Sequence, residues 1–174
     1  MRKLLVVVDM QNDFIDGALG TKEAQAIVPN VVEKIKNWDG DIAVTRDTHF
    51  DNYLNTREGR YLPVKHCIDG DNGWQLNADI DDAIFSKAYN QTHFIEKSQF
   101  GSFALVDWVN KMGYDYVELI GLCTDICVVS NALLIKNALP ELDIAVDSKC
   151  CAGVTPESHD AALLTMKMCQ IDIL

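Results

Sequence analysis

The sequence contains no long hydrophobic run. Its first apolar stretch covers only residues 4–8 and ends at Asp9, and no small-residue cleavage site follows. A secretory signal peptide needs a longer apolar region, and a membrane-spanning helix needs about 20 apolar residues in succession. We therefore expect a cytoplasmic protein without a signal peptide and without a membrane partner.

Positive charge is scarce in this chain. The sequence has 15 lysine and arginine residues against 26 aspartate and glutamate residues, which gives a net charge of −11. An excess of negative charge disfavours contact with phosphate backbones and with anionic lipid surfaces. The charge therefore argues against a nucleic-acid-binding function, and it carries no information about catalysis.

The 6 cysteines do not have the spacing of a structural zinc site. Cys123 and Cys127 lack a second pair that would complete a Cys₄ or Cys₂His₂ set. Disulfide bonds are not expected without an export signal, so most of the cysteines should be small buried side chains, Cys169 among them. These absences leave one question open, which is whether a cysteine acts as a nucleophile.

Short β-rich stretches alternate with helical patterns along the chain. The 174 residues, of which 48% are hydrophobic, suit a single domain over residues 1–174. The alternation predicts right-handed βαβ units, and hence a Rossmann-like α/β fold with a mostly parallel six-stranded sheet and helices on both faces. The expected strands cover 4–8, 41–47, 92–98, 116–122, 142–148 and 170–174. The expected helices cover 28–38, with Pro29 in the first turn, 104–113, 126–139 and 156–169.

One stretch breaks this alternation. Residues 48–91 are mostly polar and contain Gly59, Gly70 and Gly73, without a clear strand or helix pattern. A loop of that length inside a compact domain is usually functional. We interpret it as part of a binding site and not as a linker.

Reactive side chains follow several of the expected strands. Asp9 follows the first strand and Lys97 lies at the end of the third, while Cys123 and Cys127 come after the fourth. The C-terminal ends of parallel strands share one edge of the sheet, where ligands bind in open α/β folds. Cys127 would lie in the first turn of a helix, where the helix dipole lowers the pKa of a thiol. Asp9 is then the candidate general base, and Lys97 would stabilise the charges that develop.

Two residues near this segment receive structural interpretations. Asp125, which precedes Cys127, is expected to cap the helix that begins there. His159, on the last expected helix, is expected to be exposed. Neither residue is assigned to the chemistry.

A candidate metal set lies in and beside the long polar stretch. Asp47 and His49 are two residues apart, so their side chains share a face of an extended segment. His66 lies further along, beyond a loop that also carries Glu58. Carboxylate and imidazole ligands of this kind suit zinc, iron or manganese. Two histidines on a surface loop are the alternative, and spacing alone leaves both interpretations open.

Four motifs together resemble the isochorismatase-like cysteine hydrolases. They are VVVDMQNDF, TRDTH, EKSQFGSF and GLCTDICV, and the resemblance runs from residue 4 to about residue 155. It implies the isochorismatase-like hydrolase fold and a catalytic triad of Asp9, Lys97 and Cys127. It also implies a cis peptide bond between Leu122 and Cys123, with the backbone N–H groups of Cys123 and Cys127 forming an oxyanion hole.

The metal-type residues are similar to those of the nicotinamidase branch of this family. That likeness implies one divalent ion, with zinc expected and iron or manganese as alternatives. The residues implied as its ligands are Asp47, His49, His66 and Glu58. The likeness also implies a substrate pocket that includes Phe14 and Leu122. This branch often has an aromatic residue where this chain has Pro63, so we expect Tyr61 or Trp74 to take its place.

The expected reaction is hydrolysis of nicotinamide to nicotinic acid and ammonia through a cysteine thioester. A related cysteine hydrolase that acts on a carbamoylated amine, a ureido acid or another small amide is the alternative. Cys127 and the metal-type residues count against isochorismatase activity, and the intact triad counts against a catalytically silent interaction module. The resemblance also allows a homo-oligomer.

Overall fold

The computed structural model describes residues 1–88 and 92–174. Six strands form one sheet in the order β3-β2-β1-β4-β5-β6, and every neighbouring pair is parallel. The predicted α/β fold with a parallel six-stranded sheet is therefore confirmed. The strands are β1 (Lys3–Val8), β2 (Asp41–Asp47), β3 (Thr92–Lys97), β4 (Tyr116–Leu122), β5 (Asp143–Ala152) and β6 (Asp172–Ile173).

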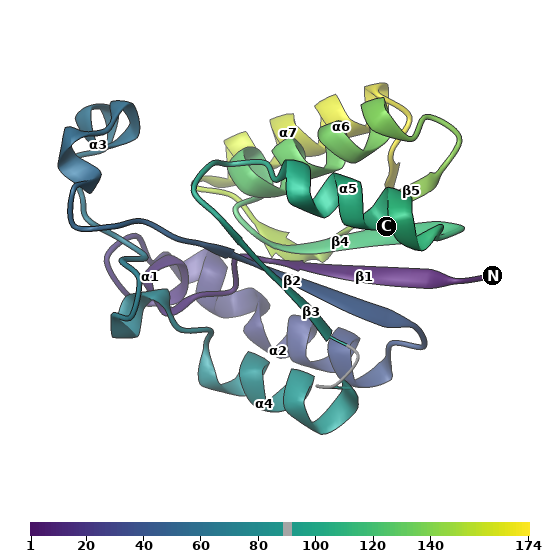
Figure 1. Cartoon of the computed structure of the whole chain (residues 1–174), viewed down its shortest axis with the longest axis horizontal. Coiled ribbons are helices and arrows are strands. Elements are labelled where there is room, and N and C mark those ends of the chain that lie inside the picture. The colour runs from purple at the N-terminus through teal and green to yellow at the C-terminus, as the bar shows by residue number, and fades with distance from the viewer. Residues whose placement is uncertain (89–91) are drawn as a thin grey trace.

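Helices cover both faces of the sheet (Figure 1). One face carries α2 (Lys22–Asn37) and α4 (Ala78–Ala88), and the other carries α5 (Phe103–Met112), α6 (Val129–Ala138) and α7 (Pro156–Met168). The short helix α1 (Asn12–Ile15) follows β1.

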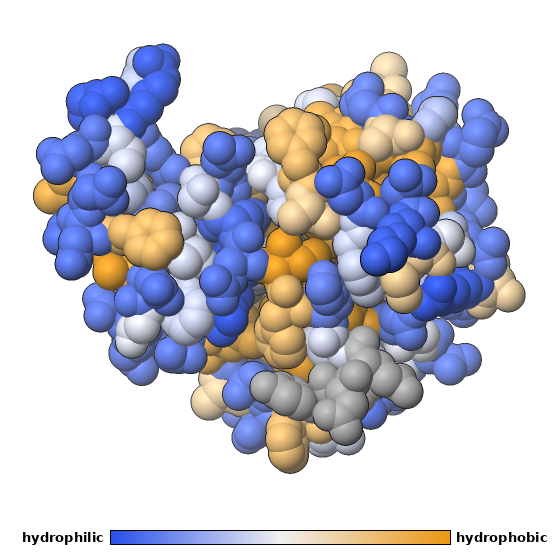
Figure 2. All heavy atoms as spheres, in the orientation of Figure 1, coloured by the Kyte–Doolittle hydropathy of each residue, from blue (hydrophilic) through white to orange (hydrophobic). Residues whose placement is uncertain are grey.

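Residues 50–65 form an arm that contains α3 (Arg57–Tyr61) and projects from these layers (Figure 1). Figure 2 shows the arm as a mostly hydrophilic projection, separated from the rest of the molecule by a notch.

β1 shows why the core has two halves. Side chains alternate between the faces of a strand, and each face of this one is covered. Leu5 and Val7 belong to the cluster that contains the buried residues of α2 and α4, whereas Leu4, Val6 and Val8 belong to the cluster of α5, α6 and α7. All five side chains are fully buried, which accounts for the continuous apolar run at the start of the sequence.

Helix α2 begins earlier than predicted. The Thr21 side chain caps it by accepting a hydrogen bond from the Ala24 N–H at 3.0 Å, and the helix runs from Lys22. The predicted start at residue 28 is wrong, and Pro29 lies inside the helix and not in its first turn. The cap and the helix-favouring residues that follow it determine this boundary, and the apolar pattern alone did not reveal it.

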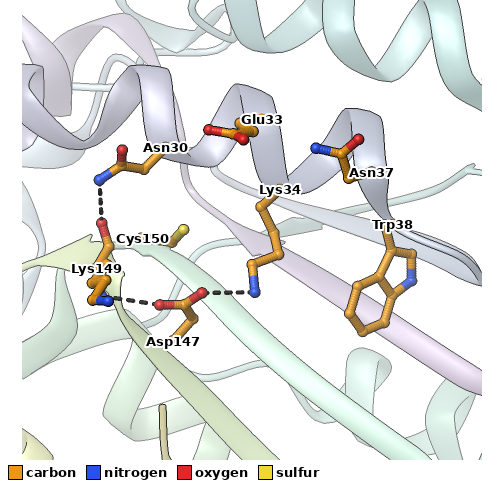
Figure 3. Close-up of a pocket in the computed structure, with 8 residues that line it drawn as sticks. All are labelled: Asn30, Glu33, Lys34, Asn37, Trp38, Asp147, Lys149 and Cys150. Carbon is orange, nitrogen blue, oxygen red and sulfur yellow. Dashed lines mark hydrogen bonds and ion pairs between the residues drawn. The ribbon is translucent and has the colours of Figure 1, made fainter.

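An ion-pair cluster fastens α2 to the sheet. Lys34 Nζ lies 2.7 Å from Glu118 Oε1 on β4 and 2.7 Å from Asp147 Oδ2 on β5. Figure 3 shows Lys34 reaching from α2 toward Asp147, with Asn30 bonded to the backbone of Lys149 beside it. The Glu118 side chain is only 4% exposed, so this carboxylate depends on Lys34 for its compensating charge.

Helix α4 lies in the stretch that was predicted to be a loop. Its buried residues Ile80, Ala83 and Ile84 follow the spacing of one helical face. The polar residues between them hid this pattern. The rest of the stretch does form connections, including the arm.

Two further details differ from prediction. β5 continues past residue 148 to Ala152, because a register shift between Leu119 and Gly121 on β4 allows pairing to resume. Cys169 is exposed and not part of the core, although all six cysteines are free, as expected.

No helix in the described ranges has the length and apolar character needed to cross a bilayer.

Candidate active site

The candidate site lies at the carboxyl edge of the sheet, where the strand order reverses. β1 is flanked by β2 on one side and by β4 on the other, and open parallel sheets bind ligands at such a point. Asp9 follows β1, and Asp47 ends β2. Lys97 ends β3, and Cys123 follows β4. The sheet therefore brings together side chains that are far apart in the sequence.

Lys97 lies between the other two residues of the predicted triad. Its Nζ is 2.6 Å from Asp9 Oδ2 and 3.5 Å from Cys127 Sγ. The same nitrogen lies 3.4 Å from Asp47 Oδ1, which belongs to the metal-type set. Burial disfavours the ammonium form, but Asp9, Cys127 and Asp47 outweigh this effect and raise the pKa of Lys97 above its ordinary value. Lys97 therefore remains a cation, and its ammonium faces Asp9, Cys127 and Asp47.

Asp9 is held by the strand beside it. Its Oδ1 accepts a hydrogen bond from Thr45 Oγ1 at 2.7 Å, and its backbone N–H donates to Thr45 O at 3.1 Å. The side chain is completely buried, and its φ of 47° lies in the left-handed region. Aspartate is one of the few residues other than glycine that tolerate this conformation.

Burial dominates the proton affinities of the triad. It raises the pKa of the Cys127 thiol well above its ordinary value; the charge of Asp9 adds to this rise, and the Lys97 ammonium opposes it. Burial also raises the pKa of Asp9, against the opposing charge of Lys97. The net pKa of the Cys127 thiol is therefore raised in the resting site, and not lowered as expected. A raised pKa favours the thiol form of Cys127, so a base would have to take its proton for the sulfur to act as a nucleophile.

Cys127 lies in a widened helical turn. Residues Thr124–Val128 form a π-helical turn ahead of α6, in which the Val128 N–H donates to Cys123 O at 3.0 Å. An α-helix from residue 126 was predicted, so the type and the start of this element differ from the prediction. Single π turns are frequent at functional sites.

Two side chains of this turn bond to the segment that follows β5. Both Asp125 carboxylate oxygens accept from the Val154 N–H, at 3.1 and 3.2 Å, so the prediction that Asp125 caps the helix is wrong. Thr124 Oγ1 lies 2.8 Å from His159 Nδ1. His159 is half-buried because of this contact and not exposed as expected.

The peptide bond between Leu122 and Cys123 is cis, as the resemblance implies. Gly121 precedes it with a φ of 117°, and a Cβ at that position would overlap the backbone of Val8. Glycine therefore allows β4 to approach β1 closely at this point. Burial raises the pKa of the Cys123 thiol to about 12.

The four predicted metal-type residues lie together. Asp47 Oδ2 is 2.8 Å from His49 Nε2 and 3.5 Å from His66 Nε2. Glu58 Oε1 lies 3.6 Å from His49 Nε2 and 3.7 Å from His66 Nε2. Burial opposes ionisation of Asp47, but its close approach to the two histidines and the charge of Lys97 outweigh this effect and hold the pKa of that carboxyl well below its usual range. The alternative of two surface histidines does not apply, because both are buried.

These donors fit a divalent metal ion. All four ligand atoms lie within 4.8 Å of one another. His49 Nε2 is buried without a well-aligned hydrogen-bond partner among the described residues, which is costly unless something else binds it. His66 Nδ1 lies 2.9 Å from Val64 O, and donation to that carbonyl leaves Nε2 free to bind an ion. Two imidazoles and two carboxylates are a ligand set that zinc, iron and manganese accept.

Sequence reasoning missed Tyr53, which packs against both histidines. Its ring centroid lies 4.8 Å from that of His49 and 5.0 Å from that of His66. The residue is 1% exposed, and its hydroxyl donates to Leu62 O at 2.9 Å. Burial raises the pKa of Tyr53 to about 12. Its place in the sequence between His49 and Glu58 was the only signal that could have pointed to it.

Gln11 was also missed. This buried side chain accepts from the Asp47 N–H at 2.7 Å and donates to Asp47 O at 2.8 Å and to Trp74 O at 2.9 Å. It therefore fixes the backbone of a metal-type residue from the segment that follows Asp9. A glutamine beside an apolar strand was the available signal.

A cavity of about 260 Å³ lies between the arm and the sheet edge. Its walls are mostly apolar, and its volume suits a ligand smaller than a typical drug molecule. Phe14 and Leu122, the predicted pocket residues, both line it. The other residues that line it include Asp47, Glu58, Leu62, His66, Phe100, Cys123, Ile126, Cys127 and Val154.

The prediction that Tyr61 or Trp74 replaces an aromatic at Pro63 is wrong. Tyr61 is 78% exposed on the arm. Trp74 Nε1 donates to Thr48 Oγ1 at 2.9 Å, and Trp74 does not line the cavity. Leu62 and Phe100 contribute to the apolar wall of the cavity. Leu62, which precedes Pro63, therefore fills part of the space that the expected aromatic residue would take.

The chain matches the family model described as Isochorismatase domain over residues 3–174. It is 27% identical over 190 residues to a nicotinamidase/pyrazinamidase of Mycobacterium tuberculosis (strain ATCC 25618 / H37Rv), covering 99% of this chain and 98% of that protein. Its fold is similar to the crystal structure of nicotinamidase/pyrazinamidase PncA from Bacillus subtilis, with a TM-score of 0.87, 26% identity and coverage of 99% of each chain. It is also similar to pyrazinamidase of Pyrococcus horikoshii in complex with zinc, with a TM-score of 0.84, 28% identity and coverage of 100% of this chain and 99% of that one.

Proposed function

The chain belongs to the isochorismatase family, and from that premise we propose that it is a metal-dependent amidohydrolase that converts nicotinamide and water to nicotinic acid and ammonia. One observation carries the proposal. A single small cavity is lined by the sulfur-bearing Cys127 and by the metal-type residues Asp47, Glu58 and His66. The relatives named nicotinamidase or pyrazinamidase support the same substrate class.

Asp47, His49, Glu58 and His66 would hold the ion, and zinc is the ion that we propose. When bound, such an ion supplies an electrophilic site for a ring nitrogen of the substrate. The apolar walls formed by Phe14, Leu62 and Phe100 suit the faces of a small aromatic ring.

The covalent steps belong to the triad. Asp9 takes the proton of Cys127, and the thiolate attacks the amide carbonyl carbon. The N–H groups of Cys123 and Cys127 bind the oxyanion that forms. Asp9 returns its proton to the amide nitrogen, the C–N bond breaks, and ammonia leaves a thioester on Cys127. Asp9 then removes a proton from water as the water attacks the thioester. The C–S bond breaks, the acid is released, and the leaving sulfur takes that proton from Asp9, which restores the thiol and the carboxylate.

Lys97 makes this sequence feasible in a buried site. Its ammonium lies 2.6 Å from Asp9 Oδ2 and 3.5 Å from the sulfur, so it faces negative charge on either group. When a proton moves from Cys127 to Asp9, the negative charge moves from the Asp9 carboxylate to the Cys127 sulfur. Both groups lie beside Lys97. The cation offsets the cost of burying that anion at each stage.

Ammonia release from nicotinamide tests the proposal, with benzamide as the matched substrate that lacks the ring nitrogen. We expect turnover of nicotinamide with added zinc and a loss of most of the rate with benzamide. Equal rates for both amides would contradict recognition of the ring nitrogen. Turnover of a carbamoylated amine or a ureido acid with no turnover of nicotinamide would contradict the proposed substrate and leave the triad chemistry intact.

A further inference from the structure

A buried amide connects two segments of the candidate site. Asn131 lies on α6 and is 0% exposed. Its Nδ2 donates to Cys127 O at 2.8 Å and to Phe100 O at 3.2 Å, and its Oδ1 accepts from the Ser102 N–H at 2.9 Å. The two donor contacts and the acceptor contact require an amide, because a carboxylate lacks the donors and an apolar side chain lacks both.

Each partner belongs to a segment that the chemistry uses. Cys127 carries the nucleophilic sulfur. Phe100 lines the cavity and lies in the loop that follows Lys97 at the end of β3. Ser102 ends that loop, and its hydroxyl accepts from the Leu105 N–H at 3.1 Å as the cap of α5.

The loop between Lys97 and α5 lies tightly against α6. A Cβ added at Gly101 would overlap the Leu134 side chain of α6. The loop is therefore in close contact with α6 at Gly101, and the bonds to Asn131 oppose its movement away from the helix. Only one hydrogen bond joins Lys97 to Cys127 directly, at 3.5 Å.

We propose that Asn131 is a positioning residue that sets the placement of the Lys97 ammonium relative to the Cys127 sulfur. It acts by tying the loop after Lys97 to the turn that carries Cys127, and it touches neither the substrate nor the reacting atoms. This inference rests on the proposed function for its kinetic consequence, but the geometry of the resting site can be tested without any substrate.

Three variants separate the contacts of Asn131. Asn131→Asp places an oxygen opposite two carbonyl oxygens and keeps the acceptor for Ser102. Asn131→Ser keeps a hydroxyl that bonds to the carbonyl of Cys127 four residues back, and it loses both loop contacts. Asn137→Asp is the matched control, because Asn137 is an exposed residue of α6 whose amide makes the same kind of bond to Leu133 O, at 2.7 Å.

The first measurement is the pH profile of alkylation of Cys127 by iodoacetamide, with the adduct located by mass spectrometry. A sulfur that loses its cationic neighbour holds its proton more tightly. We expect the midpoint of the profile to move to higher pH in Asn131→Ser and Asn131→Asp, with alkylation about 3- to 10-fold slower at neutral pH, as a shift of up to one pKa unit requires. A change in access alone would alter the rate and leave the midpoint in place.

The second measurement is nicotinamide turnover at a temperature at which circular dichroism shows each variant folded. We expect kcat to fall about 10- to 100-fold in Asn131→Ser, which corresponds to roughly 1.4 to 2.7 kcal/mol in the barrier, with a smaller change in KM. The Asn137→Asp protein should match the parent in both measurements.

An unchanged alkylation midpoint in Asn131→Ser would overturn the inference, because that variant lacks both loop contacts and its small side chain fits the buried position. The same midpoint shift in Asn137→Asp would also overturn it, by showing that any α6 amide has this effect. A midpoint shift in a protein that turns over no nicotinamide would support the positioning role and contradict the proposed function instead.

Discussion

Asp9 combines features that a general base in this site needs. It is buried, it is held by Thr45, and it lies beside the ammonium of Lys97. Burial raises its pKa above the ordinary value for aspartate. In the proposed mechanism the carboxylate must be ionised to take the proton of Cys127, so we expect protonation of Asp9 to remove activity.

We expect the acidic limb of the pH profile of kcat/KM to lie at higher pH than an ordinary aspartate would give. Below that limb Asp9 is protonated and the rate falls with decreasing pH; above it the carboxylate is available. Steady-state kinetics across the acidic range, on protein shown to remain folded, measures this limb. A profile that stays flat down to the ordinary pKa of aspartate would contradict the assignment of Asp9 as the base.

The two cysteines of the turn differ in what a substitution removes. Cys127→Ala removes the sulfur that Lys97 contacts, so we expect activity to fall on the order of a thousandfold or more. Cys123→Ala keeps the backbone N–H, so we expect activity within about tenfold of the parent, or roughly 1.4 kcal/mol in the barrier. Ammonia release measures both effects. A mass-spectrometric adduct of an electrophilic amide analogue on Cys123 would reverse the assignment.

At the scale of elements, strand bounds were the most predictable feature. β2 and β4 begin and end where the sequence predicts. Helix starts were less predictable. The start of α2 depends on the Thr21 cap, and acidic residues stand between the residues of the apolar face of α4 in the sequence. The π turn at Cys127 has no sequence pattern that distinguishes it from an α-helical turn.

The candidate site was predictable where it depends on strand ends and motifs. Asp9, Lys97 and Cys127 meet because parallel strands share one edge. Gln11, Tyr53 and Asn131 were not predictable, because their roles depend on contacts between segments that only the folded chain brings together.

Helix α2 offers a test of an element's attachment. Lys34→Met leaves the nearly buried Glu118 carboxylate without its compensating cation. Asp147, the other partner of Lys34, also loses its ion pair. Removal of one partner of a fully buried pair costs about 3–5 kcal/mol, and the partial exposure of Lys34 reduces this to about 1–3 kcal/mol. Urea unfolding measures the change, with Lys36→Met on the same helix as the control. Equal stability of the two variants would show that the cluster contributes little.

The pH dependence of this contribution follows from the direction of the Lys34 shift. Burial disfavours the Lys34 ammonium, but Asp147 and Glu118 outweigh this effect and raise the pKa of Lys34 above the ordinary value for lysine. The stabilisation is therefore fully present below the pKa of lysine in the unfolded chain, and it is lost as pH rises through the higher pKa of the folded state. The stability difference between parent and Lys34→Met should thus stay constant from neutral pH until the alkaline range.

At the scale of the whole molecule, the arm has few attachments. It contributes Glu58 to the metal-type set and Leu62 to the cavity wall, while the buried ring of Tyr53 packs against the two histidines. A bound ion would add a link between the arm and Asp47. Loss of that link should leave the arm more mobile than the sheet.

We expect chelation to increase tryptic cleavage of the arm after Arg57, Arg60 and Lys65, and added zinc to reverse this increase. An ion at a hundred times its dissociation constant stabilises the folded state by about 2.7 kcal/mol, or very roughly 5–10 °C in Tm for a chain of this size. Peptide mapping and calorimetry measure the two effects. Cleavage that rises equally at Lys167 at the end of α7 would indicate general unfolding and would contradict a local effect.

The metal-type residues are all contained in residues 47–66, whereas the triad draws on segments from Asp9 to Cys127. Closing a short loop costs less conformational entropy than gathering distant segments, so the donor set can partly assemble in a chain whose sheet has not formed. An unfolded chain that still captures the ion gains stability from it as well. The Tm shift on metal binding should therefore fall below the value that the affinity of the folded protein alone implies.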